Sequence, residues 1–148
     1  MKTLFLLSAL LTVVSPRTYR KCELARELRG YGLGGYHGYS LEDWVCLVEN
    51  ESSYRTFIVN ANEDSGTIAS RDYGLFQINS KWWCEDGQTS NSHNVCRIQC
   101  SDLLDDDIRD DAVCAKRVVR NPRRMKAWRG WVRGCQRDLR NFLSECDL

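Results

Sequence analysis

The sequence predicts an α+β domain in which helices at both ends of the chain flank a small antiparallel sheet. Two observations predict this class. Apolar residues recur at helical spacing near both ends, whereas residues 56–78 are rich in β-prone residues and turn residues. The length of 148 residues suits one domain and is too short for two comfortable ones.

The first residues predict a signal peptide. Lys2 supplies a positive charge ahead of an apolar run over residues 4–14. This run is too short to cross a membrane, which takes about 20 apolar residues, but it suits the apolar region of a signal peptide. We expect a signal peptide over residues 1–16 and a mature domain over residues 17–148, with cleavage after Ser15 or Pro16. No later stretch is apolar enough to span a membrane, so a secreted protein is expected.

Two helices are predicted early in the domain. Leu24 and Leu28 form one apolar face over residues 21–30, and the glycine cluster that follows is typical of a helix end. Ser40 is a good N-cap for a second helix, with Asp43 three residues later. We expect this second helix to end near residues 51–54.

The middle of the chain predicts the sheet. Residues 57–59 are β-prone, residues 60–66 indicate a turn, and residues 67–69 and 73–78 are predicted as strands. Residues 84–100 are polar and indicate a loop that is held by disulfides rather than by packing.

Further helices are predicted in the last third of the chain, where acidic and basic residues lie in separate stretches. Helical spacing resumes over residues 113–119 and continues over 125–132. The formal net charge is only +1, yet aspartates crowd residues 102–111 and basic residues dominate 116–140. The basic stretch is either a solvated helical face or a surface that attracts an anionic partner such as a bacterial envelope.

An even number of cysteines behind a signal peptide predicts four disulfides formed in an oxidising compartment. The eight are Cys22, Cys46, Cys84, Cys96, Cys100, Cys114, Cys135 and Cys146. Their spacing alone does not choose among the many possible pairings. A zinc site that uses Cys96 and Cys100 is the alternative, but only His37 and His93 could join it, and a secreted context opposes free thiolates.

Several short motifs have a distinctive order along the chain. They are Gly38-Tyr-Ser-Leu41, Trp44-Val-Cys46, Glu51-Ser52, Asp72-Tyr-Gly-Leu-Phe-Gln-Ile-Asn-Ser80, Trp82-Trp-Cys84 and Met125-Lys-Ala-Trp128. Together they resemble the c-type lysozymes and their relatives, the α-lactalbumins, from about residue 21 to the C-terminus. The resemblance implies a helical lobe and a small β lobe with a cleft between them. It also implies the disulfides Cys22–Cys146, Cys46–Cys135, Cys84–Cys100 and Cys96–Cys114.

The resemblance implies an antibacterial glycoside hydrolase that cuts the β-1,4 bonds of bacterial cell-wall peptidoglycan with retention. This chemistry needs a protonated carboxyl for the leaving oxygen and an ionised carboxylate for the oxocarbenium-like carbon. By resemblance Glu51 is the acid, and Asp72 is the nucleophile or stabiliser. We expect Trp128 to desolvate Glu51 and raise its pKa, and Asn62 and Asn79 to favour the ionised form of Asp72. The matched flanks disfavour the alternative that both are ordinary surface carboxylates.

Two adjacent tryptophans, Trp82 and Trp83, lie in a predicted loop, where core tryptophans are unusual. Aromatic faces stack on sugar rings, so we interpret both as sugar-binding residues, with core packing as the alternative. Trp44 and Trp131 are instead expected in the core. By resemblance the full set of substrate-binding residues is Asn62, Asn79, Trp82, Trp83, Ala127 and Trp128.

The aspartate-rich stretch predicts a calcium site. Calcium prefers several carboxylate and carbonyl oxygens, and the stretch lacks the EF-hand pattern. It resembles the calcium loop of α-lactalbumins and of the calcium-binding c-type lysozymes. Carried over, Asp105, Asp110 and Asp111 provide carboxylates, while Asp102 and Asp107 provide backbone carbonyls. Compensation of a helix dipole is the alternative, but it accounts for only some of these acids.

Four features depart from the family pattern. Glu49 and Asn50 precede the acid, where a less polar neighbour is common. The hairpin between Glu51 and Asp72 is longer than expected, and residues 121–124 replace a glycine-containing loop at the upper cleft. Residues 50–52 form an N-glycosylation sequon beside the acid, which we expect to be mostly unoccupied.

Two other functions compete with hydrolysis. One is a non-catalytic regulator of a glycosyltransferase, as in the α-lactalbumins, but the presence of both Glu51 and Asp72 favours the hydrolase. The other is an antimicrobial protein that acts through the basic stretch without catalysis. We expect a monomer that acts on cell-wall polysaccharide, with no nucleic-acid partner and no stable membrane insertion.

Overall fold

The computed structural model describes residues 3–8 and 15–148. Residues 3–8 have no regular secondary structure, and their apolar side chains are exposed. The remainder of the predicted apolar leader, residues 9–14, lies outside the described residues. No helix among the described residues is both long enough and apolar enough to cross a membrane.

Helices α1 (Lys21–Gly30) and α2 (Leu41–Ser52) agree with the prediction. The predicted apolar face of α1 is buried through Leu24 and Leu28. Ser40 caps α2 in a complete capping box, because its Oγ accepts from the Asp43 amide at 3.1 Å while Asp43 Oδ2 accepts from the Ser40 amide at 3.1 Å. A short 3-10 helix, Tyr36–Gly38, lies between the two helices.

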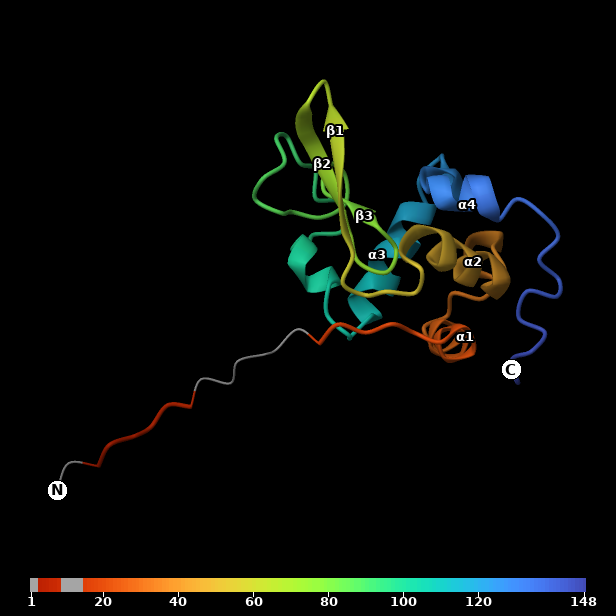
Figure 1. Cartoon of the computed structure of the whole chain (residues 1–148), viewed down its shortest axis with the longest axis horizontal. Helices are drawn as coiled ribbons and strands as arrows, with labels where there is room; N and C mark the ends of the chain where they lie inside the picture. Colours follow the sequence, from red (N-terminus) through yellow and green to blue (C-terminus); the bar gives the residue numbers. More distant parts are fainter. Residues whose placement is uncertain (1–2, 9–14) are drawn as a thin grey trace.

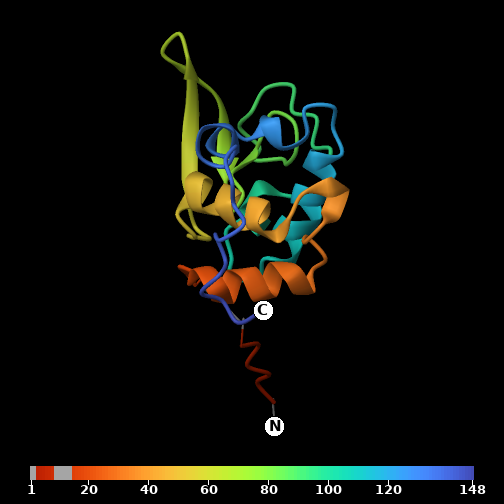
Figure 2. The same cartoon turned by 90° about the vertical axis from the view of Figure 1, so that its right-hand side faces the viewer.

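The sheet is antiparallel, with strands β1 (Val59–Asp64), β2 (Thr67–Tyr73) and β3 (Ile78–Asn79) in the order β1-β2-β3. Both views show the β1–β2 hairpin projecting from the body (Figures 1 and 2). The predicted turn over residues 60–66 was wrong, because most of it is strand. Pairing with β2, for example Asn60 opposite Asp72, holds these polar residues extended although all of β1 is exposed.

The predicted strand over residues 73–78 was also wrong in its middle. Gly74 has a φ of +78° and Gln77 a φ of +50°, and neither angle is compatible with an extended strand. The chain turns there, and the Gln77 side chain donates to the Gly74 carbonyl at 3.0 Å. Only Ile78–Asn79 pairs as β3, which places Asn79 opposite Asp72.

The C-terminal third contains α3 (Arg109–Val119) and α4 (Arg129–Gly134), with 3-10 helices at Cys100–Leu103 and Arg124–Ala127. The predicted continuous helix over residues 125–132 is interrupted at Trp128, whose backbone is extended (φ −102°, ψ 115°). The Trp128 side chain at this break is buried in the core.

The core lies between the helices and the segment that runs from the end of β2 to β3. Trp44 is fully buried and meets the rings of Phe76 and Trp128 edge to face. Trp131, predicted as a core residue, is only partly buried and packs against this core. All four disulfides form the pairs that the resemblance implied: Cys22–Cys146, Cys46–Cys135, Cys84–Cys100 and Cys96–Cys114.

Candidate active site

Glu51 lies in the last turn of α2 and is partly buried. Its Oε1 accepts a hydrogen bond of 2.8 Å from the backbone amide of Gly130 in α4. Burial raises the pKa of the Glu51 carboxyl. The Gly130 hydrogen bond opposes the rise, the charge of Asp72 adds to it, and the charge of Arg133 opposes it. The net effect is a raised pKa, which favours a carboxyl group that keeps its proton.

Asp72 lies in β2, where amide side chains from both neighbouring strands converge on it. Asn79 Nδ2 donates to Asp72 Oδ1 at 2.9 Å, and the same amide donates to Ser70 Oγ at 2.9 Å. Asn62 in β1 donates to Ser70 Oγ at 3.2 Å. The polar surroundings expected for Asp72 are therefore present, and they come from strand register rather than from sequence neighbours.

The electrostatic balance at Asp72 differs from the expected one. Burial raises the pKa of Asp72, and this outweighs the lowering by Asn79, Asn62 and the charge of Arg129. The sequence indicates which polar groups surround this carboxyl, but its burial depends on the packed fold.

The tryptophans have different surroundings. Trp128 is only 4% exposed, and its Nε1 donates to the Phe76 carbonyl at 2.7 Å, so it forms a wall rather than an open platform. Trp82 is 52% exposed, which excludes core packing for this residue. Trp83 is partly buried and packs against the core, as does Ala127 before Trp128.

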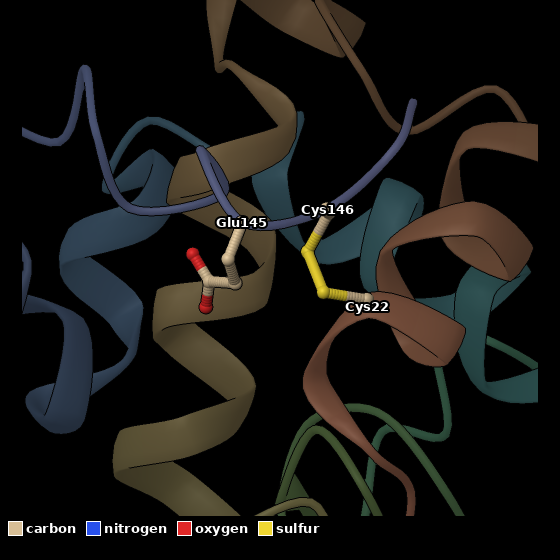
Figure 3. A group of neighbouring side chains, drawn as sticks. All are labelled: Cys22, Glu145 and Cys146. Carbon is tan, nitrogen blue, oxygen red and sulfur yellow. A yellow bond between two sulfur atoms is a disulfide. The ribbon is translucent and has the colours of Figure 1, made fainter.

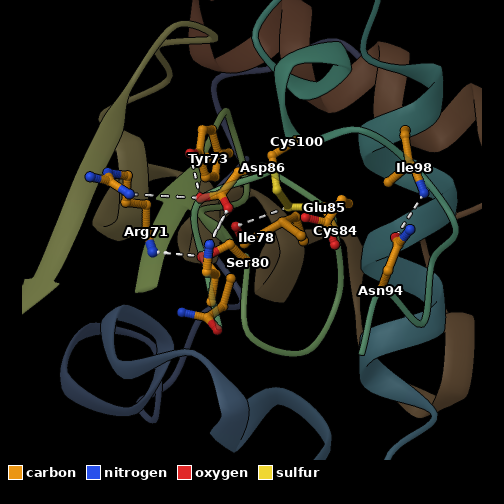
Figure 4. Close-up of a disulfide and its surroundings, with 12 residues drawn as sticks. Arg71, Tyr73, Ile78, Ser80, Cys84, Glu85, Asp86, Asn94, Ile98 and Cys100 are labelled. Atoms are coloured by element: carbon orange, nitrogen blue, oxygen red, sulfur yellow. Dashed lines mark hydrogen bonds and ion pairs between the residues drawn. A yellow bond between two sulfur atoms is a disulfide. The ribbon is translucent and has the colours of Figure 1, made fainter. Parts of the chain in front are cut away.

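An aspartate that the sequence analysis did not single out supports the strand of Asp72. The carboxylate of Asp86 accepts from Tyr73 Oη at 2.8 Å and from Thr89 Oγ1 at 2.9 Å, and Arg71 approaches it at 4.0 Å (Figure 4). Burial alone would raise the pKa of Asp86, but hydrogen bonds from Gln88, Tyr73 and Thr89 lower it below the ordinary value. Since Arg71 and Tyr73 flank Asp72, this network fixes both sides of the candidate site. The Asp86-Gly87 turn signal was the available indication.

Comparison with known proteins decides the family. Residues 17–146 match the model of the C-type lysozyme/alpha-lactalbumin family. The chain belongs to this family.

Its similarity to individual lysozymes covers most of the chain. It is 50% identical over 136 residues to the dog milk isozyme of lysozyme C, which covers 89% of this chain and 100% of that protein. It is also 50% identical over 149 residues to the cow milk isozyme, which covers 99% of each. A crystal structure of canine milk lysozyme superposes with a TM-score of 0.84 at 49% identity, covering 89% of this chain and 100% of that one. These similarities confirm the predicted resemblance and the lysozyme-like fold.

One further solved lysozyme structure is similar to this chain. A calcium-binding lysozyme from equine milk superposes with a TM-score of 0.83 at 48% identity, covering 89% of this chain and 100% of that chain. In the present family member the acidic stretch runs from the 3-10 helix at Cys100–Leu103 to the first turn of α3.

Asp111 is the unusual member of this stretch. It is fully buried, and neither carboxylate oxygen has a hydrogen-bond partner among the described residues. Burial raises its pKa well above the ordinary value, and the charges of Asp105, Asp110 and Asp107 add to the rise. A side chain on Gly74 would come within 3.1 Å of Asp111 Oδ2 and would clash with the Leu103 carbonyl. The buried carboxylate therefore lies directly against the turn that follows β2.

The other acidic side chains surround Asp111 without closing on it. Asp107 forms an ion pair with Arg109 at 2.7 Å, so its carboxylate is already engaged. Asp105 Oδ1 accepts from the Asp107 amide at 3.2 Å. Within the described part of the chain, the carboxylates of Asp105, Asp110 and Asp111 do not gather within 4.8 Å of one another.

Among the described residues, ligand-type atoms do lie close together in Cys22, Glu145 and Cys146 (Figure 3). The two cysteines are joined in a disulfide, so they offer no thiolate to a metal. Glu145 is paired with Lys21 at 3.1 Å. This group is structural, and so is the Cys96–Cys114 disulfide, which excludes the zinc alternative.

Proposed function

We propose that this family member is a secreted lysozyme that hydrolyses the β-1,4 bonds of bacterial cell-wall peptidoglycan and is thereby antibacterial. The observation that carries the proposal is the pairing of two carboxyls in different surroundings. Glu51 has one backbone hydrogen bond at the end of a helix. Asp72 instead lies on a strand, where the Asn79 amide donates to it at 2.9 Å and Asn62 also lowers its pKa. Glycoside hydrolysis needs this difference between its two carboxyls, and lysozyme is itself the type case.

In the first step Glu51 donates its proton to the glycosidic oxygen as the bond to the leaving sugar breaks. The raised pKa of Glu51 keeps this proton available at a pH where an ordinary glutamate is ionised. The Gly130 amide then stabilises the carboxylate that remains, because its hydrogen bond is to the ionised form.

Asp72 acts on the sugar carbon that becomes positive in the transition state. The amides of Asn79 and Asn62, together with the charge of Arg129, favour its ionised form against burial. The developing positive charge on the sugar favours ionisation further. Asp72 traps or stabilises this carbon, and Glu51 then accepts a proton from water, so that the configuration is retained.

The sugar chain is bound by residues around these carboxyls. Trp82 offers an exposed indole on which a sugar ring stacks, and Trp83 adds its indole nitrogen. Trp128 and Ala127 form the opposite wall, and Asn62 and Asn79 serve both Asp72 and the substrate.

We include one structural calcium ion in the proposal. A fully buried carboxylate without a partner among the described residues is costly unless a cation compensates it, and Asp111 is such a group. The carboxylates of Asp105, Asp110 and Asp111 and the carbonyls of Asp102 and Asp107 would hold the ion. Bound calcium supplies positive charge that stabilises the loop, and it takes no part in the bond cleavage.

The compartment follows from the chemistry of the chain. Four disulfides suit an oxidising environment outside the cell, and the apolar leader supplies the signal for secretion. A monomeric mature domain over residues 17–148 is proposed.

The deciding experiment is the clearance of a Gram-positive cell-wall suspension by the mature protein and by Glu51→Gln. The substitution keeps the shape of the side chain but removes the transferable proton, so clearance should fall by about 10²-fold or more. Equal melting temperatures of the two proteins serve as the control for folding. Failure of the folded parent protein to clear the walls would reject the hydrolase and favour the regulator of a glycosyltransferase. Equal clearance by both proteins would favour lysis without catalysis through the basic stretch.

A further inference from the structure

Trp82 and His93 form a stacked aromatic pair. Their ring centroids are 4.6 Å apart and their planes differ by 7°, so the imidazole covers one face of the indole. Trp82 is nevertheless 52% exposed, and His93 is itself an exposed residue. The exposed part of Trp82 therefore belongs to its other face and its edge.

The main chain fixes this pair. The amide of His93 donates to the Lys81 carbonyl at 2.9 Å, and the amide of Val95 donates to the Trp82 carbonyl at 2.9 Å. Ser92 Oγ also donates to the Ser80 carbonyl at 2.7 Å. Disulfides anchor both paired segments, through Cys84 in one and Cys96 in the other. The stack is thus built into the loop and does not depend on two free side chains meeting by chance.

Charge does not explain the position of His93. Among the described residues His93 takes part in no ion pair, and the neighbouring Lys81 directs its ammonium group to the Ser90 carbonyl at 3.0 Å. The ring contact with Trp82 is the interaction that the histidine side chain makes. An exposed indole without such a support would rotate freely about two side-chain bonds and would have to be ordered when a ligand binds.

We propose that His93 is a positioning residue for substrate binding, which holds the Trp82 indole so that its one open face receives the apolar face of an N-acetylhexosamine ring. This inference rests on the proposed function, because it assigns the ligand of Trp82 to the cell-wall sugar class. His93 acts through Trp82 and does not take part in bond cleavage. Its removal should weaken the binding of sugars and leave the turnover of bound substrate nearly unchanged.

Binding is measured with chitotriose, in the Glu51→Gln background so that no hydrolysis occurs. His93→Ala should raise the dissociation constant by about 2- to 10-fold, the range that an aromatic pair contributes. His93→Phe keeps a planar ring and should restore binding to within about twofold of the parent. Gln88→Ala, an exposed substitution in the same loop, is the matched control and should bind as the parent does. In the active background, KM for a chitin oligomer should rise in His93→Ala while kcat stays within about twofold.

The outcomes separate the two proposals. If the parent binds chitotriose with this dependence on His93 but fails to hydrolyse cell walls, the proposed function fails and the positioning role stands. If His93→Ala binds chitotriose as tightly as the parent, the positioning role is overturned. It is also overturned if His93→Phe does not restore the lost affinity. In both cases the proposed hydrolase function still stands. Absence of chitotriose binding in the parent overturns the positioning role together with the sugar assignment.

Discussion

The backbone amide of Gly130 donates to Glu51 Oε1 at 2.8 Å and so joins α4 to the last turn of α2. This single hydrogen bond limits the effect of burial, because it favours the carboxylate while burial favours the protonated acid. Burial favours the protonated acid before it gives up its proton, and the hydrogen bond favours the carboxylate that remains afterwards. The position of α4 therefore bears directly on the chemistry proposed for Glu51.

Replacement of Asp72 by Asn tests the second carboxyl. The amide keeps the size of the side chain but has no negative charge, so it cannot trap or stabilise the positive sugar carbon. We expect wall hydrolysis to fall by about 10²-fold or more, with a melting temperature close to that of the parent. Rates are measured on purified wall suspensions. A folded Asp72→Asn variant with near-parental rates would remove Asp72 from the mechanism.

The pH profile tests the environment of both carboxyls. Activity requires Asp72 ionised and Glu51 protonated, so kcat/KM should rise as Asp72 loses its proton and fall as Glu51 loses its own. Because both pKa values are raised, both limbs should lie above the ordinary values of 3.8 and 4.5.

A charge substitution sharpens this test. Arg133 lowers the pKa of Glu51, so Arg133→Gln should move the descending limb to higher pH. Arg120→Gln, an exposed substitution of the same kind at the end of α3, should leave the limb in place. A profile that is the same in all three proteins would show that Arg133 does not act on the acid.

Calcium should control thermal stability through Asp111. In calcium-free protein the pKa of Asp111 is higher in the folded state than in the unfolded state. The contribution of this group to the free energy of unfolding is therefore fully present below the unfolded-state pKa, and it is lost as pH rises through the folded-state pKa. At neutral pH a chelator should therefore lower the melting temperature. Calcium at a hundredfold excess over its dissociation constant should raise the free energy of unfolding by about 2.7 kcal/mol.

Asp111→Asn separates this effect from general destabilisation. The variant removes the buried charge, so in chelator it should melt above the parent, and added calcium should no longer raise its melting temperature. Scanning calorimetry at pH 7 and pH 5 measures both proteins. A parent whose melting temperature is the same with calcium and with chelator would contradict the calcium proposal.

The basic stretch should direct the protein to anionic walls. Arg123 and Arg124 are exposed at the start of a 3-10 helix, where they are free to meet a polyanion. Their replacement by Ser should raise the amount of enzyme needed to lyse whole cells and should barely affect a short neutral chitin oligomer. Salt screens exposed charges over about 8 Å at physiological ionic strength, so the difference between the proteins should shrink as salt is added. Equal losses on both substrates would place these arginines in the cleft instead.

Local signals predicted α1 and α2 well. The Ser40 and Asp43 pair fixed the start of α2, and that helix delivers Glu51 to the site. Polar Asn60 and Asn62 were assigned to a turn because a strand exposed on both faces shows no alternation, and its order comes from pairing with β2. The break at Trp128 was missed for a related reason, since its indole is drawn into the core by Trp44 and the Phe76 carbonyl.

The candidate site shows the same division between local and long-range information. The motifs predicted the two carboxyls and the aspartates around Asp111, and they included Asn79, which donates to Asp72. The net pKa shift of Asp72 and the stack of His93 on Trp82 required the packed structure. Burial and ring contacts across a loop depend on residues that are not neighbours in sequence, so short sequence motifs do not predict them.

The close approach of Gly74 to Asp111 has a consequence for how the molecule comes apart. Gly74 follows Asp72 by only two positions and comes directly after β2, and its lack of a side chain lets the acidic loop lie against the end of that strand. Loss of order in the loop would remove one wall of the turn and expose the end of the strand. The small sheet and the acidic loop should therefore open as one cooperative unit, ahead of α1 and α2, and their amides should exchange hydrogen for deuterium together.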